Sequence, residues 1–226
     1  MKTPAIQTIL VPTDFSKLSG RAIETAKNIA QRFDANVHLA HVHEFYYPSG
    51  LIAPLPFSFA AYRADAEIQG TRRLKVLAKK NGTAAEHCHF MDGAPPFSEI
   101  CNLAQGISAD LIVMPTHDYT GLTRVFLGNT AERIVQHSPC PVLVIRADKN
   151  AGRSSLDGKT GIDNILVPVD FSQSSFQALE YAIAFAERVA AKLIILHMPG
   201  LRPHRDGRKW KGCKASRCKY PRAKSR

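Results

Sequence analysis

Short apolar runs alternate along the chain with longer amphipathic segments of helical period. The run TILVPTD at residues 8–14 is rich in apolar side chains and bounded by proline and aspartate, which is typical of a buried strand. The segment that follows, residues 18–34, places its apolar side chains on one helical stripe, with Ser16 or Ser19 as a candidate N-cap. The chain therefore opens with a strand followed by a helix.

The same alternation continues to the middle of the chain. Further strands are predicted at residues 36–44, 86–93, 109–116 and 140–147, and further helices at residues 60–82, 95–108 and 129–138. Strands that alternate with helices indicate an α/β fold with a parallel sheet. We therefore expect a doubly wound five-stranded parallel sheet, flavodoxin-like or Rossmann-like, with helices on both faces and right-handed crossovers.

The beginning of the chain is repeated near its end. Residues 6–42 align without a gap with residues 162–198, at a shift of 156 positions. Matched pairs include Pro12 and Pro168, Asp14 and Asp170, and His41 and His197. Such self-similarity indicates a duplicated domain start. The second copy provides a β-α-β unit and loses the pattern near residue 200, so it cannot close a five-stranded sheet of its own.

These patterns divide the chain into four parts. We expect a complete domain at residues 1–147, a polar linker at 148–161, a truncated second domain at 162–200 and a basic tail at 201–226. The tail holds 11 of the 30 lysines and arginines and one of the 19 acidic residues, which leaves 19 − 18 = +1 for everything before it. The net charge of +11 therefore describes the tail and not the folded body.

The tail at residues 201–226 has few apolar side chains and no periodicity, so we expect it to be disordered. Three interpretations remain open: a nucleic-acid-binding arm, a solvated terminus without a role, or the product of a shifted reading frame. We favour a truncation or a shifted frame, with any nucleic-acid affinity incidental.

Histidines gather on the second and third predicted strands, at His38, His41, His43, His87 and His89. They would form a cluster if the two strands were neighbours, but we expect the strand order to keep them only loosely opposed. Because no carboxylate pair completes a ligand set, we predict no metal site. No nucleophile arrangement fits this fold either, so we predict no catalytic residues.

Several features point to the cytoplasm. No apolar run approaches the length of a membrane span, and the first residues show no signal-peptide pattern. The five cysteines are odd in number and scattered, which argues against a disulfide framework and for reduced thiols.

Four stretches together resemble the universal stress protein family. They are ILVPTDFS from residue 9, ADLIVMPTHD from residue 109, LGNTAERIVQHSPCPVLVIR from residue 127 and ILVPVDFS from residue 165. The resemblance covers residues 5–146 completely and 162–200 as a truncated second copy. It implies a flavodoxin-like sheet, frequent homodimers, and a role in surviving starvation, oxidative or respiratory stress. Some members of the family bind ATP and some do not.

The ATP-binding members carry Gly-x-x-Gly, nine residues, and then Gly-Ser or Gly-Thr. Here the same frame has Pro115 and Asp118 at the first two glycine positions, followed by Gly128-Asn129. The resemblance implies that Pro12, Thr13, Asp14 and Val42 match positions around the adenosine, and that His117 and Gly128 match positions around the ribose and phosphates. With the polar Asn129 and Thr130 beside Gly128, the candidate nucleotide site comprises Pro12, Thr13, Asp14, Val42, His117, Gly128, Asn129 and Thr130.

The departures from the family motif weaken this site. A carboxylate at Asp118 about 4 Å from a phosphate would repel it by ~4 kcal/mol at an effective dielectric of 20, unless a divalent cation such as Mg²⁺ bridges the two. Pro115 removes an amide donor, although Asn129 and Thr130 still offer polar groups. The alternative for residues 128–130 is a plain helix cap, and the alternative for Asp14 is a turn residue.

We therefore interpret the chain as a universal stress protein that acts by ligand binding and association rather than by catalysis. One alternative is an ATP-binding member with slow nucleotide hydrolysis. Another is a nucleic-acid-associated protein that acts through the tail.

Overall fold

The computed structural model describes residues 6–44, 57–116, 128–145 and 162–197. The chain divides into two compact units, one from Ala5–Gly158 and the other mainly from Lys159–Arg226. The predicted linker at 148–161, the predicted tail at 201–226 and the site residue His117 lie outside the described residues.

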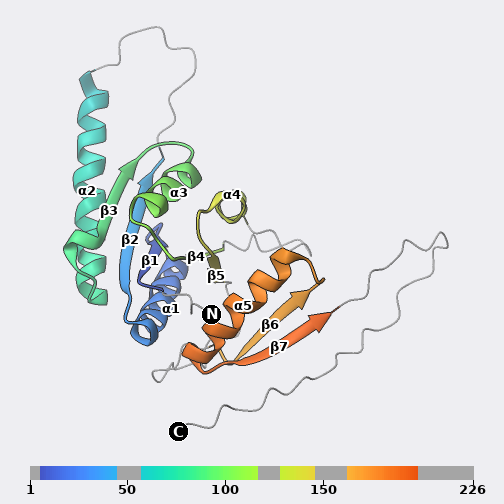
Figure 1. The fold of residues 1–226 in the computed structure, drawn as a ribbon. Helices are drawn as coiled ribbons and strands as arrows, with labels where there is room; N and C mark the ends of the chain where they lie inside the picture. The colour runs from blue at the N-terminus through green and yellow to red at the C-terminus, as the bar shows by residue number, and fades with distance from the viewer. Residues whose placement is uncertain (1–5, 45–56, 117–127, 146–161, 198–226) are drawn as a thin grey trace, which may run out of the picture. The chain divides into compact units, whose positions relative to one another are not determined.

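The first unit is built on a parallel sheet (Figure 1). Its strands are β1 (Thr8–Pro12), β2 (Asn36–His43), β3 (Cys88–Asp92), β4 (Leu111–Pro115) and β5 (Val142–Ile145). They lie in the order β3-β2-β1-β4-β5, and every pair is parallel. The predicted five-stranded, doubly wound sheet is thereby confirmed.

Within the described residues, four α-helices and one short 3₁₀-helix connect these strands. They are α1 (Lys17–Phe33), α2 (Phe57–Asn81), η1 (Ala85–His87), α3 (Pro96–Gly106) and α4 (Asn129–His137). Helix α1 contacts β1, β2 and β4, helix α2 contacts β2 and β3, and helix α3 packs against α4 and β2. Buried Leu10 and Ile112 pack with Ala104 of α3 and Ile134 of α4. Because strand side chains alternate between faces, the buried neighbours of Leu10 on β1 point to the opposite face.

Helix α1 begins where the sequence pattern placed it. Of the two candidate caps, Ser16 holds the N-cap position, and its side-chain oxygen accepts a hydrogen bond from the backbone N–H of Ser19 at 3.2 Å. The helix ends at Phe33, and its C-cap Asp34 adopts the left-handed conformation with φ of 56°. Its apolar stripe is buried, as the 3.6-residue period predicts.

The expected separation of the second and third strands is wrong. Strands β2 and β3 are direct neighbours, with Leu39 opposite Cys88 and Ala40 opposite His89. The reason is that the doubly wound order places β2 and β3 successively on one side of β1, so the chain crosses to the other side only before β4. As a result, Nδ1 of His38 lies 2.9 Å from Nε2 of His89.

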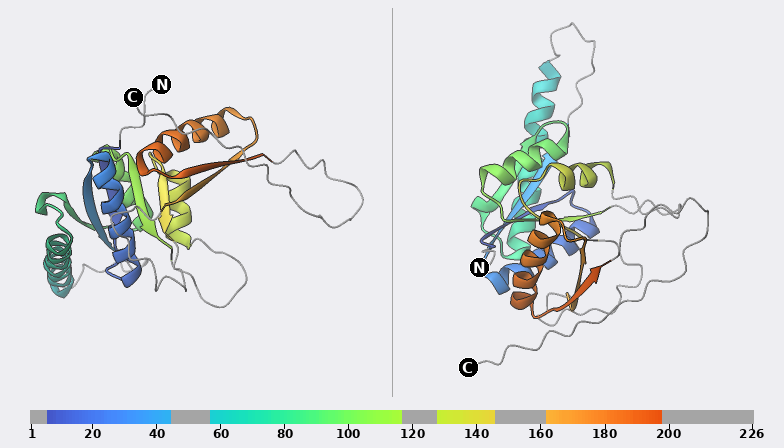
Figure 2. Two further views of the ribbon diagram at one scale, coloured as in Figure 1. Left: turned by 90° about the horizontal axis from the view of Figure 1, so that it is seen from below. Right: turned by 45° about the vertical axis from the view of Figure 1, so that its right-hand side comes forward.

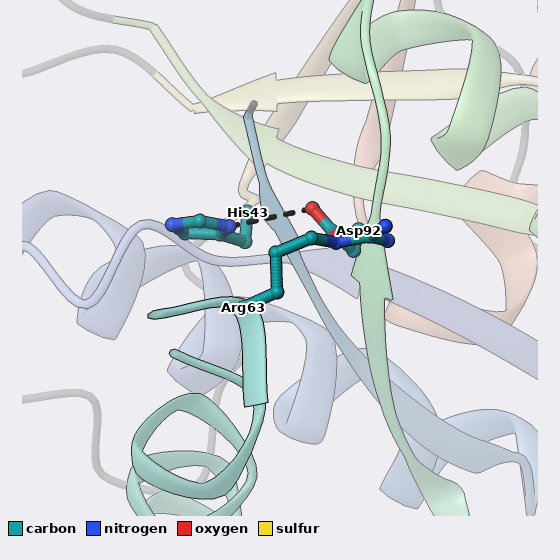
Figure 3. Close-up of polar contacts among 3 residues, drawn as sticks. All are labelled: His43, Arg63 and Asp92. Carbon is teal, nitrogen blue, oxygen red and sulfur yellow. Dashed lines mark hydrogen bonds and ion pairs between the residues drawn. The ribbon is translucent and has the colours of Figure 1, made fainter. Parts of the chain in front are cut away.

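A close packing contact and a group of polar contacts join α2 to β3. Gly70 lies against Phe90, since a Cβ atom at Gly70 would stand 2.5 Å from Cδ2 of that ring and closer still to Cε2. Near the start of α2, Nε of Arg63 donates to Oδ2 of Asp92 at 2.5 Å, and Nδ1 of His43 lies 3.4 Å from Oδ1 of the same carboxylate (Figure 3). The Asp92 carboxylate thus joins the carboxyl ends of β2 and β3 to α2.

The second unit repeats the beginning of the first. It consists of β6 (Asn164–Val169), α5 (Gln173–Val189) and β7 (Lys192–His197), with β6 parallel to β7. Figure 2 shows α5 along one side of this strand pair. The partial second β-α-β copy predicted from the repeat is confirmed. Across the described residues of both units, no helix is long and apolar enough to cross a membrane.

Candidate functional site

A cleft of about 440 Å³ lies at the carboxyl ends of the central strands of the first unit. It is lined by residues that follow or end β1, β2 and β4 and by the first turn of α4. This is the edge at which open α/β sheets bind ligands. The described members of the predicted site all line it, namely Pro12, Thr13, Asp14, Val42, Gly128, Asn129 and Thr130.

Hydrogen bonds fix the loop between β1 and α1, which forms one wall of the cleft. The Thr13 hydroxyl accepts from the backbone N–H of Phe15 at 3.0 Å. Oδ1 of Asp14 accepts from the backbone N–H of Ser16 at 2.9 Å and from the hydroxyl of Ser19. Asp14 is therefore a turn residue, as one interpretation of the sequence had it, and it also faces the cleft.

His41 holds the same loop from the neighbouring strand. Its Nδ1 atom lies 2.8 Å from the carbonyl oxygen of Thr13. Because a carbonyl oxygen only accepts, Nδ1 carries the proton and donates. Burial lowers the pKa of His41 below its ordinary value, although the hydrogen bond to Thr13 opposes this shift. The ring of Phe15 covers the imidazole, with centroids 4.4 Å apart. The lowered pKa favours the neutral imidazole, which positions the wall of the cleft through its bond to Thr13.

The opposite wall is the first turn of α4. Gly128 is its N-cap, with a φ of 78° that favours glycine, and no side chain among the described residues caps the helix there. Asn129 is accordingly the first helical residue and not the cap. The first amides of a helix lack partners within the helix. Since Asn129, Thr130 and Ala131 all line the cleft, this turn offers N–H donors to a ligand.

The charges around the cleft are negative. Asp14 and Glu44 line it, and no lysine or arginine appears among the described residues that do so. Pro115, at the end of β4, also lines it and has no N–H to donate. The positive end of the α4 dipole is therefore the main attraction for an anion in the described part of the cleft.

Apolar side chains form the floor of the cleft, and most of them lie outside the sequence motifs that predicted the site. Helix α3 provides Pro96 and Ile100, strand β4 provides Met114, and helix α4 provides Ala131 and Ile134. Sequence reasoning missed these residues because they come from separate elements, α3, β4 and α4, which meet at the cleft only in the folded chain. It also left His41 without a role, although the matching His197 in the second copy was a usable signal.

Comparison with known proteins agrees with this architecture. The profile of the universal stress protein family matches residues 5–146 and 161–202. A universal stress protein from Methanocaldococcus jannaschii is 37% identical over 142 residues, which cover 62% of this chain and 82% of that protein. Universal stress protein E from Escherichia coli is 31% identical over 142 residues, but the match spans only 43% of its length.

A solved structure shares the fold over most of the chain. The universal stress protein from Archaeoglobus fulgidus aligns with 87% of this chain and 68% of its own, with a TM-score of 0.59 and 19% sequence identity. The sequence stretches, the strand order and the family profile lead to the same assignment. The chain belongs to the universal stress protein family.

Proposed function

We propose that the cleft binds the adenosine part of a nucleotide, weakly when the ligand is ATP, and that this binding makes the chain a ligand-responsive stress protein. One observation carries the proposal. Residues from three separate stretches, around Asp14, Val42 and Gly128, line one cleft at the ligand-binding edge of the sheet.

The two halves of the cleft suit the two halves of a nucleotide. The apolar floor, which includes Val42, Ile100 and Met114, offers a surface on which a purine can be buried. The first turn of α4 at Asn129 and Thr130 offers amides to a phosphate. A volume of about 440 Å³ lies within the usual range for small-molecule sites.

Charge limits the affinity for a polyphosphate. The carboxylates of Asp14 and Glu44 repel phosphates, and Pro115 withholds an amide. A Mg²⁺ ion accompanying ATP would offset part of this repulsion. We therefore expect ATP to bind more weakly than micromolar, and better with Mg²⁺ than without it. Binding without turnover is the main proposal, and slow hydrolysis of ATP is the alternative.

Isothermal titration calorimetry with adenosine, AMP and ATP, with and without Mg²⁺, tests the proposal. Val42→Trp should fill the cleft and abolish binding, whereas Val76→Trp, on the exposed face of α2, should leave it unchanged. Failure of all three compounds to bind at millimolar concentration would contradict the proposal, as would binding that Val42→Trp does not affect. Release of phosphate during the titration would favour the hydrolytic alternative.

Association of two chains is the second part of the proposal. Strand β5 is an edge of the first unit's sheet, since it pairs with β4 alone among the described strands. Open parallel edges invite pairing with another strand. We propose a homodimer through β5, or pairing of β5 with the second copy. A strict monomer in light scattering, together with a chain that tolerates cleavage at 148–161 without effect, would contradict both forms.

We also place this activity in the cytoplasm, which the free thiols of Cys88, Cys101 and Cys140 support. Selective alkylation of these thiols in intact cells, without prior reduction, is the expected result. Protection of the thiols until a reductant is added would argue for an oxidising compartment.

A further inference from the structure

One face of the second unit's sheet is apolar and is not covered by α5, the helix that the structure describes there; on this face Leu166 and Pro168 are exposed, and Ile194 and Leu196 are partly buried. Leu166 lies opposite Ile194, and Pro168 lies opposite Leu196, so these four side chains form a continuous patch. The alternate positions on both strands pack with α5, which turns this patch away from the helix. Leu166 is 59% exposed. We call these four residues the β6–β7 face.

In the first unit, helices cover the face that corresponds to the β6–β7 face. Leu10 stands at the position that corresponds to Leu166, within the same ILVP run. Leu10 is 0% exposed, because Ile100 and Ala104 of α3 and Ile134 of α4 pack in the same cluster. The repeat therefore retains a strand whose side chains suit burial on both faces, while the described part of the second unit covers only one of them.

We propose that the β6–β7 face is an interface between two copies of this chain, packed face to face about a two-fold axis. The β6–β7 face of a second chain has the same width and the same apolar character, so the two faces can cover each other. In a contact with two-fold symmetry, each chain uses the same patch. Sheets packed in this way lie about 10 Å apart and bury the side chains between them.

The charge on this face also favours a symmetric pair. Of the six strand positions that point away from α5, one is charged: Lys192, which lies opposite Asn164 at the start of the strands. A two-fold axis that makes the strands of the two copies antiparallel sets the two lysines at opposite ends of the contact. They are then separated by roughly 20 Å, the length of a six-residue strand, which is beyond the screening length at physiological salt. Leu166 and Ile194 of the two copies meet in the uncharged centre.

This interface is separate from the one proposed for β5, and a variant distinguishes them. Leu166→Lys places a charge in the centre of the β6–β7 face without disturbing a buried position, so the chain should fold as before. Val76→Lys is the matched control, since Val76 is 65% exposed on α2 of the first unit. Far-ultraviolet circular dichroism checks the fold of both variants.

Sedimentation velocity over a wide range of concentration is the measurement, made on the full chain. We expect the unchanged chain and Val76→Lys to self-associate alike, and Leu166→Lys to associate about tenfold more weakly or worse. A bis-maleimide reagent whose span is about 10 Å, the separation of packed sheets, should link Leu166→Cys chains into dimers in a yield well above that of Val76→Cys or the unchanged chain. If Leu166→Lys proves misfolded, Ile194→Lys and the Leu166→Cys cross-link decide the question.

Three outcomes would overturn the proposal. The first is a chain that stays monomeric at all concentrations, which would mean that something other than a second copy covers the β6–β7 face. The second is self-association that Leu166→Lys leaves intact, which would assign the dimer to β5 instead. The third is equal cross-linking at Leu166→Cys and Val76→Cys.

Discussion

The imidazole of His41 donates a hydrogen bond from Nδ1 to the carbonyl oxygen of Thr13 at 2.8 Å, and so ties the end of β2 to the loop that forms one wall of the cleft. The second unit reproduces this relationship, with Nδ1 of His197 2.8 Å from the carbonyl oxygen of Val169. The phenylalanine beside each histidine also repeats, with ring centroids 4.4 Å apart in both units. The same short sequence therefore builds the same junction twice, but a cleft of about 440 Å³ lies beside the first of them.

This repetition provides a matched pair of variants. His41→Phe removes the donor to Thr13 and should destabilise the chain by about 1–3 kcal/mol, the cost of leaving a buried carbonyl unpaired. It should also weaken nucleotide binding, because the wall formed by Thr13 and Asp14 loses its support. His197→Phe removes the equivalent bond in the second unit and should leave nucleotide binding unchanged. Chemical denaturation and calorimetry on both variants give the comparison, and equal effects on binding would show that His41 does not support the cleft.

The close approach of α2 to β3 depends on Gly70. Gly70→Ala adds a Cβ atom that would collide with the ring of Phe90, so helix or ring must shift. Overpacking a core costs roughly 1–3 kcal/mol, and the helix propensity of alanine offsets about 1 kcal/mol of this cost, so we expect a net loss of up to about 2 kcal/mol in the free energy of unfolding. Gly106→Ala is the control, since a Cβ atom there meets nothing within 4 Å. Urea denaturation of the two variants is the measurement, and a stabilised Gly70→Ala chain would refute this interpretation of the contact.

Much of the fold could be predicted from local patterns, and the parts that could not depend on distant residues. The ILVP run and the apolar stripe of α1 are local, so the first strand and helix were found, and the observed cap Ser16 was one of the two candidates. The pairing of β2 with β3 depends on where the sheet reverses its winding, which no local pattern records. The contact of Gly70 with Phe90 likewise depends on how α2 folds back onto β3, which the periodicity of neither element reveals.

The candidate site divides in the same way. Its motif residues at both ends, near Asp14 and Gly128, could be found because their spacing follows a family pattern. Its apolar floor, with Ile100 and Met114, could not be recognised, since those side chains look like any other core residue until the helices are in place. His117 lies outside the described residues, so its part in the site remains a prediction.

Stability should fall as the solution is acidified, because of histidines on β2 and β3. The pKa of His38 is lowered from 6.5 to about 4, chiefly by burial and then by the neighbouring imidazoles of His87 and His89. Below pH 6.5, His38 is protonated in the unfolded chain but stays neutral in the folded chain. Protonation therefore favours the unfolded state, and the free energy of unfolding should decrease as the pH falls from 6.5 toward 4.

His38→Ile tests this pH dependence, since Ile194 is the natural residue at the corresponding position of the second copy. The variant should lose less stability than the unchanged chain over the same pH interval. Urea denaturation at a series of pH values measures the slope for both, with the exposed His137→Gln as control. An identical slope for His38→Ile and the unchanged chain would show that His38 does not titrate as described.

Nucleic-acid binding, if it occurs, should depend on residues 201–226. That segment has a net charge of +10, against +1 for everything before it. Removing it should abolish any salt-sensitive affinity for DNA or RNA, because phosphate neutralisation requires the lysines and arginines that it holds. Titrations of the full chain and of residues 1–200 at two salt concentrations make the comparison. Undiminished binding by the shorter chain would locate the interaction in the folded body.

Nucleotide titration monitored by nuclear magnetic resonance tests the central claim most directly, since backbone amides report where a ligand binds. We predict that ATP with Mg²⁺ shifts the amides of Thr13, Asp14, Asn129 and Thr130, all of which line the cleft, with an affinity weaker than micromolar. Adenosine alone should shift the amides near Val42 and leave those of α4 almost unchanged. No shifts at millimolar nucleotide, or shifts confined to residues outside the cleft, would contradict the account.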